Sequence, residues 1–198
     1  MQKTYAIDPV MWGNFAIGDF CDQLVEWIGD RKVLETFAGN GVFASMLAER
    51  KVAIRSTSLF ASHDGHRDGM YFDVIEMDAT KAVHMFGDES DILLMCWPTS
   101  TEAAFKTAAR WGAERPIVFI GEVTQLDKGL LGGCASDNFF EVTDEISVFS
   151  AYTPRSYIDR AAVRQLNPEK FGAWRDEARK RILSGADQMN ALMSVVLD

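Results

Sequence analysis

Apolar and polar positions along the N-terminal part of the chain predict a helix, a strand and a second helix in succession. Between residues 19 and 28 the apolar side chains recur every three or four positions, as on one helical face: Phe20, Leu24, Trp27 and Ile28. A short apolar run at residues 33–37 then ends at glycines, and residues 42–50 return to helical spacing. We therefore expect strand, glycine turn and helix, preceded by another helix.

The chain continues with the same alternation of strand-like and helix-like segments. Four further apolar runs have the length of strands, at residues 52–57, 72–76, 91–96 and 116–120. Helical spacing lies between them at residues 79–86 and 101–111. Strands that alternate with helices form a mostly parallel sheet with helices on both faces. The pattern predicts an α/β protein.

The hydrophobic pattern changes in the last third of the chain. The apolar runs at residues 139–143 and 146–149 are separated only by Asp144 and Glu145, and strands this close in sequence pair antiparallel. Beyond them, Pro168 near a helix start favours one or two helices in residues 167–198. We expect five parallel strands, an antiparallel terminal hairpin and C-terminal helices.

Length and composition favour a single folded domain. A chain of 198 residues with 47% apolar and 25% charged residues is typical of a globular protein. At this size one core buries roughly 70% of the surface that the unfolded chain exposes. We divide the domain 1–198 into an N-terminal helical segment (1–30), a sheet core (31–150) and C-terminal helices (151–198).

The charge balance bears on the choice of partner. A net charge of -9 makes attraction to nucleic-acid phosphates unfavourable, although a local basic patch could override it. Basic residues gather at Arg160 and Arg164 and again at residues 175–181, interleaved with acids. On helices these residues would form a solvated face. Nucleic acid is therefore a disfavoured partner, though not an excluded one.

Cysteine usage points to a reducing compartment. Cys21, Cys96 and Cys134 are an odd number of cysteines at wide spacing, which argues against a disulfide framework. The beginning of the chain lacks a signal-peptide pattern, and no apolar run has the length of a membrane span. We expect a cytoplasmic protein that has no contact with a membrane.

The glycine turn after the first strand is the strongest candidate for a binding site. Glu35 ends the strand, and Gly39, Asn40 and Gly41 follow just ahead of a helix. Bare backbone lets a ligand approach, and amides at a helix N-terminus bind an anionic group. Open α/β sheets bind ligands at this end of the strands. The alternative is a tight turn that holds no ligand.

Residues 35–41, Glu-Thr-Phe-Ala-Gly-Asn-Gly, resemble the first cofactor motif of class I S-adenosylmethionine-dependent methyltransferases. The resemblance implies a three-layer αβα Rossmann-like fold with a mostly parallel seven-stranded sheet, and S-adenosylmethionine as cofactor. It places Glu35, Phe37, Gly39, Asn40 and Gly41 at the cofactor, with Phe37 where the family usually has its first glycine. The antiparallel strand pair agrees with this family, whereas a dinucleotide-binding sheet would end on a parallel strand.

The resemblance also implies cofactor contacts at the ends of the next strands. Asp78, followed by Ala79, would accept a hydrogen bond from the adenine amine, and Cys96 would line the pocket; the alternative is that Asp78 only caps the following helix. The family's ribose-binding acid is missing after the second strand. Only hydroxyls such as Ser58 stand there, so Asp64 or Asp68 would have to reach in from the following loop.

Candidate acceptor-side residues follow the fourth and fifth strands. Amino-group methylases of this family carry a polar residue, two prolines and an aromatic after the fourth strand, whereas here only Pro98 matches, after Trp97. Trp97 would stack on a flat substrate or cover the sulfonium, or else pack at the edge of the core. Glu122 would act as a base or bind an ammonium group, or else be a surface charge.

One further feature is not expected to be functional. His63 and His66 are metal-ligand types, but no third cluster at zinc-like spacing accompanies them, so we expect no metal.

The leading hypothesis is a methyltransferase acting on an unidentified acceptor, more readily a small molecule or protein than bulk nucleic acid. The alternatives are an inactive cofactor-binding or interaction module and a nucleotide-binding oxidoreductase, which Phe37 disfavours. The oligomeric state stays open.

Overall fold

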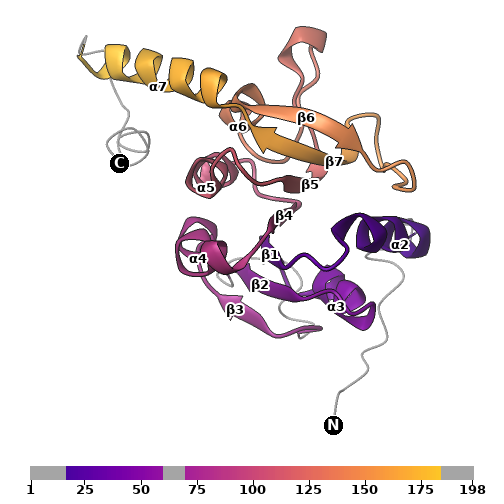
Figure 1. The fold of residues 1–198 in the computed structure, drawn as a ribbon. Coiled ribbons are helices and arrows are strands. Elements are labelled where there is room, and N and C mark those ends of the chain that lie inside the picture. Colours follow the sequence, from indigo (N-terminus) through magenta and orange to yellow (C-terminus); the bar gives the residue numbers. More distant parts are fainter. Residues whose placement is uncertain (1–16, 60–69, 184–198) are drawn as a thin grey trace.

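Seven strands form one sheet in the computed structural model, which describes residues 17–59 and 70–183 (Figure 1). The strands are β1 (Val33–Thr36), β2 (Ile54–Ser58), β3 (Val74–Glu76), β4 (Ile92–Cys96), β5 (Ile117–Glu122), β6 (Thr143–Val148) and β7 (Asp159–Leu166). They lie in the order β3-β2-β1-β4-β5-β7-β6. β7 runs antiparallel to its neighbours β5 and β6, and the other pairs are parallel.

Helices cover both faces of this sheet. They are α2 (Ile17–Ile28), α3 (Val42–Glu49), α4 (Ala79–Phe86), α5 (Ala103–Trp111), α6 (Asp137–Val142) and α7 (Pro168–Leu183), with short 3-10 turns at Gly87–Glu89 and Leu126–Lys128. α2 and α3 lie on one side, and α4 and α5 lie on the other (Figure 1). The predicted three-layer αβα arrangement is confirmed.

The core is divided in two by the sheet. The first core contains Phe20 and Leu24 of α2, Phe43 and Leu47 of α3, and Val33 of β1. The second core contains Leu34 of β1, Val83 of α4, Phe105 of α5 and Phe139 of α6. Successive β1 residues alternate between the two cores because strand side chains point to opposite faces. This alternation decides where the later β1 side chains lie.

The predicted first hairpin strand is wrong, because residues 139–142 belong to helix α6. A run as short as Phe139, Phe140 and Val142 has no decisive period, so it does not separate a buried strand from a helix. Packing decides it, since the ring of Phe119 lies 5.4 Å from the rings of both Phe139 and Phe140. The strand begins only at Thr143.

The antiparallel pair itself exists, but β6 and β7 form it. β7 lies in the segment 151–198, which the sequence pattern assigned to helices. Its residues, such as Ala161, Ala162 and Gln165, favour helices on their own. Pairing with β5 on one side and β6 on the other overrides that preference.

Arg160 and Arg164 consequently lie on β7, so the prediction of a solvated helical face is wrong for them. Arg164 is only 6% exposed, and its guanidinium donates to Thr143 Oγ1 at 2.9 Å and to Thr143 O at 2.8 Å. Burial lowers the pKa of Arg164 to about 10. Glu145 pairs with both arginines, at 3.6 Å and 3.7 Å. These bonds tie β6 to β7.

The C-terminal helix α7 packs against the second core. The rings of Phe105 and Trp174 lie 4.5 Å apart, and those of Phe171 and Trp174 are stacked at 6.2 Å. The indole of Trp174 donates to Asn138 Oδ1 at 3.1 Å, which joins α7 to α6. None of the helices in the described part of the chain has the length and apolarity to span a bilayer.

Replacing Thr143 with valine tests the junction that the sequence pattern missed. Thr143→Val keeps the shape but leaves the buried Nε of Arg164 without its acceptor and removes the bond from Thr143 Oγ1 to Phe139 O. We expect a loss of about 1–3 kcal/mol in the free energy of unfolding, measured with urea. Thr153→Val, on the exposed loop before β7, is the control and should change it by less than about 0.5 kcal/mol. Equal effects would contradict this role of Thr143.

Candidate functional site

The carboxyl ends of the parallel strands meet at one edge of the sheet. β1 lies between β2 and β4, and the connection after β1 leads to one side while that after β4 leads to the other. Such a point, where the strand order reverses, opens a crevice in which α/β proteins bind ligands. The residues predicted from sequence follow these strand ends: Phe37 and Gly39 after β1, Ser58 on β2, Trp97 after β4 and Glu122 on β5.

The glycine turn leaves the N-terminus of α3 open. Gly41 caps α3 without a side-chain hydrogen bond, and among the described residues no side chain bonds to the helix amides there. The first amides of a helix have no partners within the helix and carry partial positive charge. The turn is held to β2, since Ala38 N donates to Thr57 O at 3.1 Å and Gly39 N donates to Ser58 Oγ at 3.2 Å. The predicted strand-turn-helix context is confirmed.

Phe37 has a left-handed backbone, with φ of 64°. Side chains other than glycine rarely adopt this conformation, which costs roughly 1–2 kcal/mol. The ring is partly buried against the second core. This geometry explains why a glycine is usual at this position of the motif that residues 35–41 resemble. Here an aromatic ring occupies the position, and the core holds it there.

Gly39 and Gly41 have different surroundings. A Cβ on Gly41 would lie 2.7 Å from Val74 Cγ2 and 2.8 Å from Phe72 Cβ, whereas a Cβ on Gly39 would meet no described atom within 4 Å. Tyr71 N also donates to Asn40 O at 2.9 Å, so the chain ahead of β3 packs directly on the turn. Gly41 is therefore required by the protein's own packing, whereas no described residue would collide with a Cβ on Gly39.

Glu35 is a buried carboxyl that has only one hydrogen bond among the described residues. It is 0% exposed, and its Oε2 accepts from Ser56 Oγ at 2.7 Å, while Oε1 has no partner in the described ranges. The strand register places Ser56 and Leu94 beside it, so all three side chains point into the first core. Burial raises the pKa of Glu35 to about 7, against the Ser56 bond, which lowers it.

The residues predicted for the adenosine lie together at the ends of β2 and β3. Met77 N donates to Ser58 O at 2.9 Å, which brings Asp78 next to Ser58. Asp78 caps α4, because its Oδ1 accepts from Thr80 N at 2.9 Å and Lys81 N at 3.1 Å. The capping role is thus confirmed, and Oδ2 accepts no hydrogen bond from the described residues. Ala79 is buried as the first residue of α4.

Several of the predictions for this region fall outside the described residues. These are Asp64 and Asp68, considered for the ribose, and His63 and His66, considered and set aside as metal ligands. Within the described ranges, no group of three histidine, cysteine or acidic side chains could hold a metal ion. Cys96 is buried at the end of β4, on the same face of the sheet as Glu35, and burial raises its pKa.

Trp97 follows β4 in a left-handed conformation, with φ of 50°. Its ring packs partly against both cores, which agrees with the alternative prediction that Trp97 packs at the edge of the core. Its indole Nε1 is buried and has no hydrogen-bond partner among the described residues. The guanidinium carbon of Arg155 lies 5.1 Å from the centre of the ring. Strained residues of this kind concentrate at functional sites.

Glu122 ends β5 and is only partly exposed. Its Oε2 accepts from Gly133 N at 3.0 Å, and a Cβ on Gly133 would lie 2.8 Å from that oxygen. The carboxylate therefore fixes the loop that follows β5. Glu122 thus has a structural role that the alternative interpretation, a surface charge, did not include. Its place at the edge of the site agrees with the prediction, but one of its oxygens is occupied.

Sequence reasoning missed a buried acid at this edge, Asp159, because it assigned the segment to helices. Asp159 begins β7 opposite Glu122 and is 2% exposed. Both of its carboxylate oxygens accept from Tyr152 Oη at 2.9 Å, and Oδ2 also accepts from Arg155 N at 2.8 Å. Burial and Asp159 raise the pKa of Tyr152. No local motif marks these residues in the sequence.

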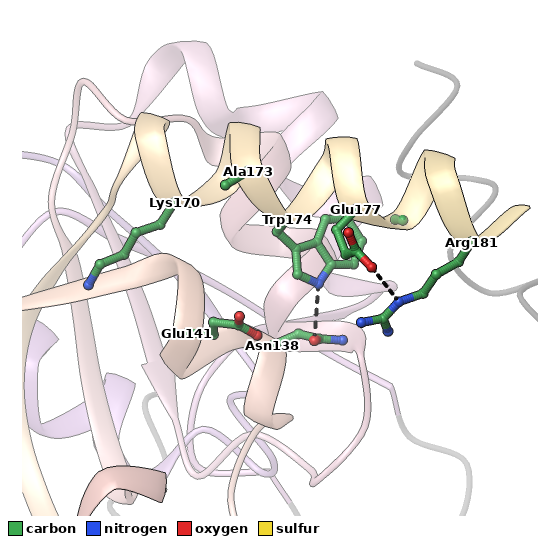
Figure 2. Close-up of a pocket in the computed structure, with 8 residues that line it drawn as sticks. Asn138, Glu141, Lys170, Ala173, Trp174, Glu177 and Arg181 are labelled. Carbon is green, nitrogen blue, oxygen red and sulfur yellow. Dashed lines mark hydrogen bonds and ion pairs between the residues drawn. The ribbon is translucent and has the colours of Figure 1, made fainter. Parts of the chain in front are cut away.

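A separate groove of about 590 Å³ lies between α6 and α7 (Figure 2). It is lined by Asn138, Glu141, Lys170, Ala173, Trp174, Glu177, Ala178 and Arg181, and none of these is a predicted site residue. Its charges pair locally, since Glu177 contacts Arg181 at 3.3 Å and Lys170 contacts Asp144 at 2.6 Å. The groove does not include the strand ends, so we place the candidate site at the sheet edge.

No known protein family and no curated protein matches this sequence. Solved structures do match the fold. A point mutant of MtNAS in complex with S-adenosylmethionine aligns with a TM-score of 0.50 and 13% identity, over 76% of this chain and 63% of that chain. The magnesium protoporphyrin IX methyltransferase ChlM from Synechocystis PCC 6803, with bound SAH, aligns with a TM-score of 0.49 and 12% identity, over 82% and 90%. This chain thus spans less than two thirds of MtNAS.

The two glycines of the turn should respond differently to alanine. We expect Gly39→Ala to lower the free energy of unfolding by about 1 kcal/mol, the cost of a side chain at positive φ. Gly41→Ala adds a collision with Val74 and Phe72 and should cost about 1–3 kcal/mol more. Urea denaturation of both variants measures the difference. Equal costs would contradict the packing of Phe72 against the turn.

The buried Glu35 should make stability depend on pH. Its pKa is about 7 in the folded state against an ordinary value of 4.5, so the folded protein holds the proton more tightly. The raised pKa adds about 3 kcal/mol to the free energy of unfolding below about pH 4.5, and this contribution is lost as the pH rises to about 7. Glu35→Gln should flatten this decline, measured by urea denaturation across that range. A decline of the same size in the variant would assign it to other groups.

Proposed function

We propose that this chain, which has the Rossmann-like fold of class I methyltransferases, binds S-adenosylmethionine at the β1–α3 turn and transfers the methyl group to an acceptor. The observation that carries the proposal is the buried carboxyl of Glu35, whose Oε1 has no partner among the described residues. The glycine turn connects Glu35 to the N-terminus of α3, where no described side chain caps the helix amides. A carboxyl that can bind a positively charged group therefore lies near helix amides that can bind a negatively charged group. The amino acid end of the cofactor has both charges.

The amino acid end of the cofactor fits these groups in one orientation. The free amides at the start of α3 would receive the carboxylate, since helix N-termini bind anions. Glu35 would receive the ammonium group through Oε1. The ligand would approach the turn at Gly39, where a Cβ would meet no atom of the described residues within 4 Å. Asn40 and Phe37, which belong to the same turn, would border the ligand.

The adenosine end would lie along the ends of β2, β3 and β4. Ser58 and the Oδ2 atom of Asp78 are the polar groups there, and Ala79 and Cys96 are small apolar neighbours. Asp78 would accept the adenine amine while its other oxygen caps α4. No acid stands at the end of β2 within the described residues, so the Ser58 hydroxyl would face the ribose. The MtNAS structure, which shares the fold, contains S-adenosylmethionine.

The acceptor would lie over Trp97 and Glu122. The bound cofactor supplies an activated methyl group on a sulfonium. The protein orients the acceptor nucleophile in line with it, and orientation supplies most of the acceleration. Trp97 would stack on the acceptor or face the sulfonium, and the second oxygen of Glu122 would hold an acceptor group. A small molecule or protein acceptor suits the net charge of -9 better than bulk nucleic acid.

A second candidate function is an S-adenosylmethionine-binding or interaction module that lacks transfer activity. It is favoured by the missing acid after β2 and by the residues after β4, where Trp97 and Pro98 replace the fuller acceptor set of amino-group methylases. The oxidoreductase alternative is less well supported, since β7 is antiparallel. In either case we propose a cytoplasmic location, because all three cysteines are free thiols.

Thermal unfolding with added ligand tests the proposed cofactor. A ligand present at about 100 times its dissociation constant adds about 2.7 kcal/mol, which raises Tm by several degrees in a chain of this size. We expect S-adenosylmethionine and S-adenosylhomocysteine to produce this shift and NAD to produce none. A folded sample that responds to neither adenosyl ligand would rule out the proposal. Binding of both without transfer to any of a panel of acceptors would favour the inactive module.

A matched pair of glycine variants locates the binding site. Gly39 and Gly29 have nearly the same φ, 57° and 58°, and a Cβ on either would meet no atom of the described residues within 4 Å. Gly39→Val and Gly29→Val therefore carry the same backbone strain, but only Gly39 lies in the turn. We expect the Gly39 variant alone to lose the Tm shift with S-adenosylhomocysteine. Equal binding by both variants would place the ligand elsewhere.

A further inference from the structure

The carboxyl of Glu35 lies in the first core, and none of the described residues places a cation beside it. From β2 the group that faces it is the Ser56 hydroxyl, and from β4 it is the Cys96 thiol. The buried side of α3 presents Val42, Phe43 and Leu47, and that of α2 presents Phe20, Cys21 and Leu24, none of which carries a charge at neutral pH. Beyond Cys96, the charges of Arg155 and Asp159 oppose each other.

These surroundings favour the neutral acid when the site holds no ligand. A buried carboxylate that has one hydroxyl donor and no counter-ion is costly, so the carboxyl keeps its proton. The pKa of about 7 agrees with this geometry. A protonated carboxyl, however, cannot form an ion pair with an ammonium group. Below about pH 7, ligand binding therefore has to change the protonation of Glu35.

We propose that the amino acid end of the cofactor displaces the proton of Glu35, so that cofactor binding and proton release are one coupled step. The inference rests on the proposed function and concerns the regulation of the same site. The O–H bond of the Glu35 carboxyl breaks, the proton goes to solvent, and the carboxylate pairs with the ligand's ammonium group, which keeps its own three protons. Cofactor affinity then rises with pH below about pH 7.

Linkage fixes the size of the effect. Only the ionised fraction of Glu35 is competent for the ion pair, so the observed dissociation constant equals the intrinsic dissociation constant divided by that fraction. With a pKa of about 7, the affinity should be roughly tenfold higher at about pH 7.5 than at about pH 6. Close to one proton should be released per ligand bound at about pH 6. If the Glu35 carboxyl stayed protonated in the complex, ligand binding would release no proton.

Isothermal titration calorimetry of the full chain with S-adenosylhomocysteine measures both quantities. Titrations at about pH 6 in two buffers of different ionisation enthalpy give the number of protons released, and titrations at both pH values give the affinity ratio. 5′-Methylthioadenosine keeps the adenosine and sulfur but lacks the amino acid end. We expect its binding to release no proton and to be the same at both pH values.

Three variants assign the effect to Glu35. Glu35→Gln cannot ionise and should lose the pH dependence, whereas Glu26→Gln, the same change at an exposed position of α2, should keep it. Ser56→Ala removes the one hydrogen bond that favours the carboxylate, so its affinity should start to rise at a higher pH. This third variant keeps the test valid if the Glu35→Gln variant does not fold.

The outcomes separate the inference from the proposed function. Binding of S-adenosylhomocysteine with no proton release and equal affinity at both pH values would overturn the inference and leave the cofactor assignment intact. The same pH dependence for 5′-methylthioadenosine, or its persistence in the Glu35→Gln variant, would also overturn it. If no adenosyl ligand binds to the folded protein, the proposed function fails, and the inference fails with it.

Discussion

The parallel pairing of β1 with β2 on one side and β4 on the other is the constraint on which the site depends. It places Glu35 in register with Ser56 and Leu94 and directs all three side chains into the first core. The same pairing brings three strand ends to one edge, where the order of the strands reverses. Without this register, the carboxyl would not meet Ser56, its one hydrogen-bond donor among the described residues, and the turn would not lie beside it.

Two aromatic residues in strained conformations flank that point of reversal. Phe37 follows β1 and Trp97 follows β4, and both have positive φ angles. The cost of each is met by packing of the rings against the cores. The chain therefore turns sharply at neighbouring strand ends while keeping large apolar surfaces at the crevice. This arrangement suits a site that excludes water from a transfer reaction.

Burial has opposite consequences for the two acids at this edge. The two oxygens of Asp159 share the one proton of the Tyr152 hydroxyl, and Oδ2 also accepts from the Arg155 amide, so the role of Asp159 is to hold the loop before β7. Glu35 accepts one hydrogen bond and keeps an oxygen without a partner among the described residues. A satisfied buried acid is structural, whereas an incompletely satisfied one has capacity left for a ligand. The difference lies in the number of donors that the fold supplies.

The sequence pattern by itself determined the first five strands, the helices α2 to α5 and the glycine turn, because short apolar runs alternate there with segments of helical spacing and are bounded by glycine or charge. It failed for α6 and β7. The apolar run at Phe139 is too short to have a period, and the alanines and arginines of β7 favour a helix until β5 and β6 pair with them. Only the tertiary structure decided that Glu35 is fully buried and that Asp159 joins the edge. Burial and hydrogen bonding depend on neighbours distant in the chain, and local sequence does not contain them.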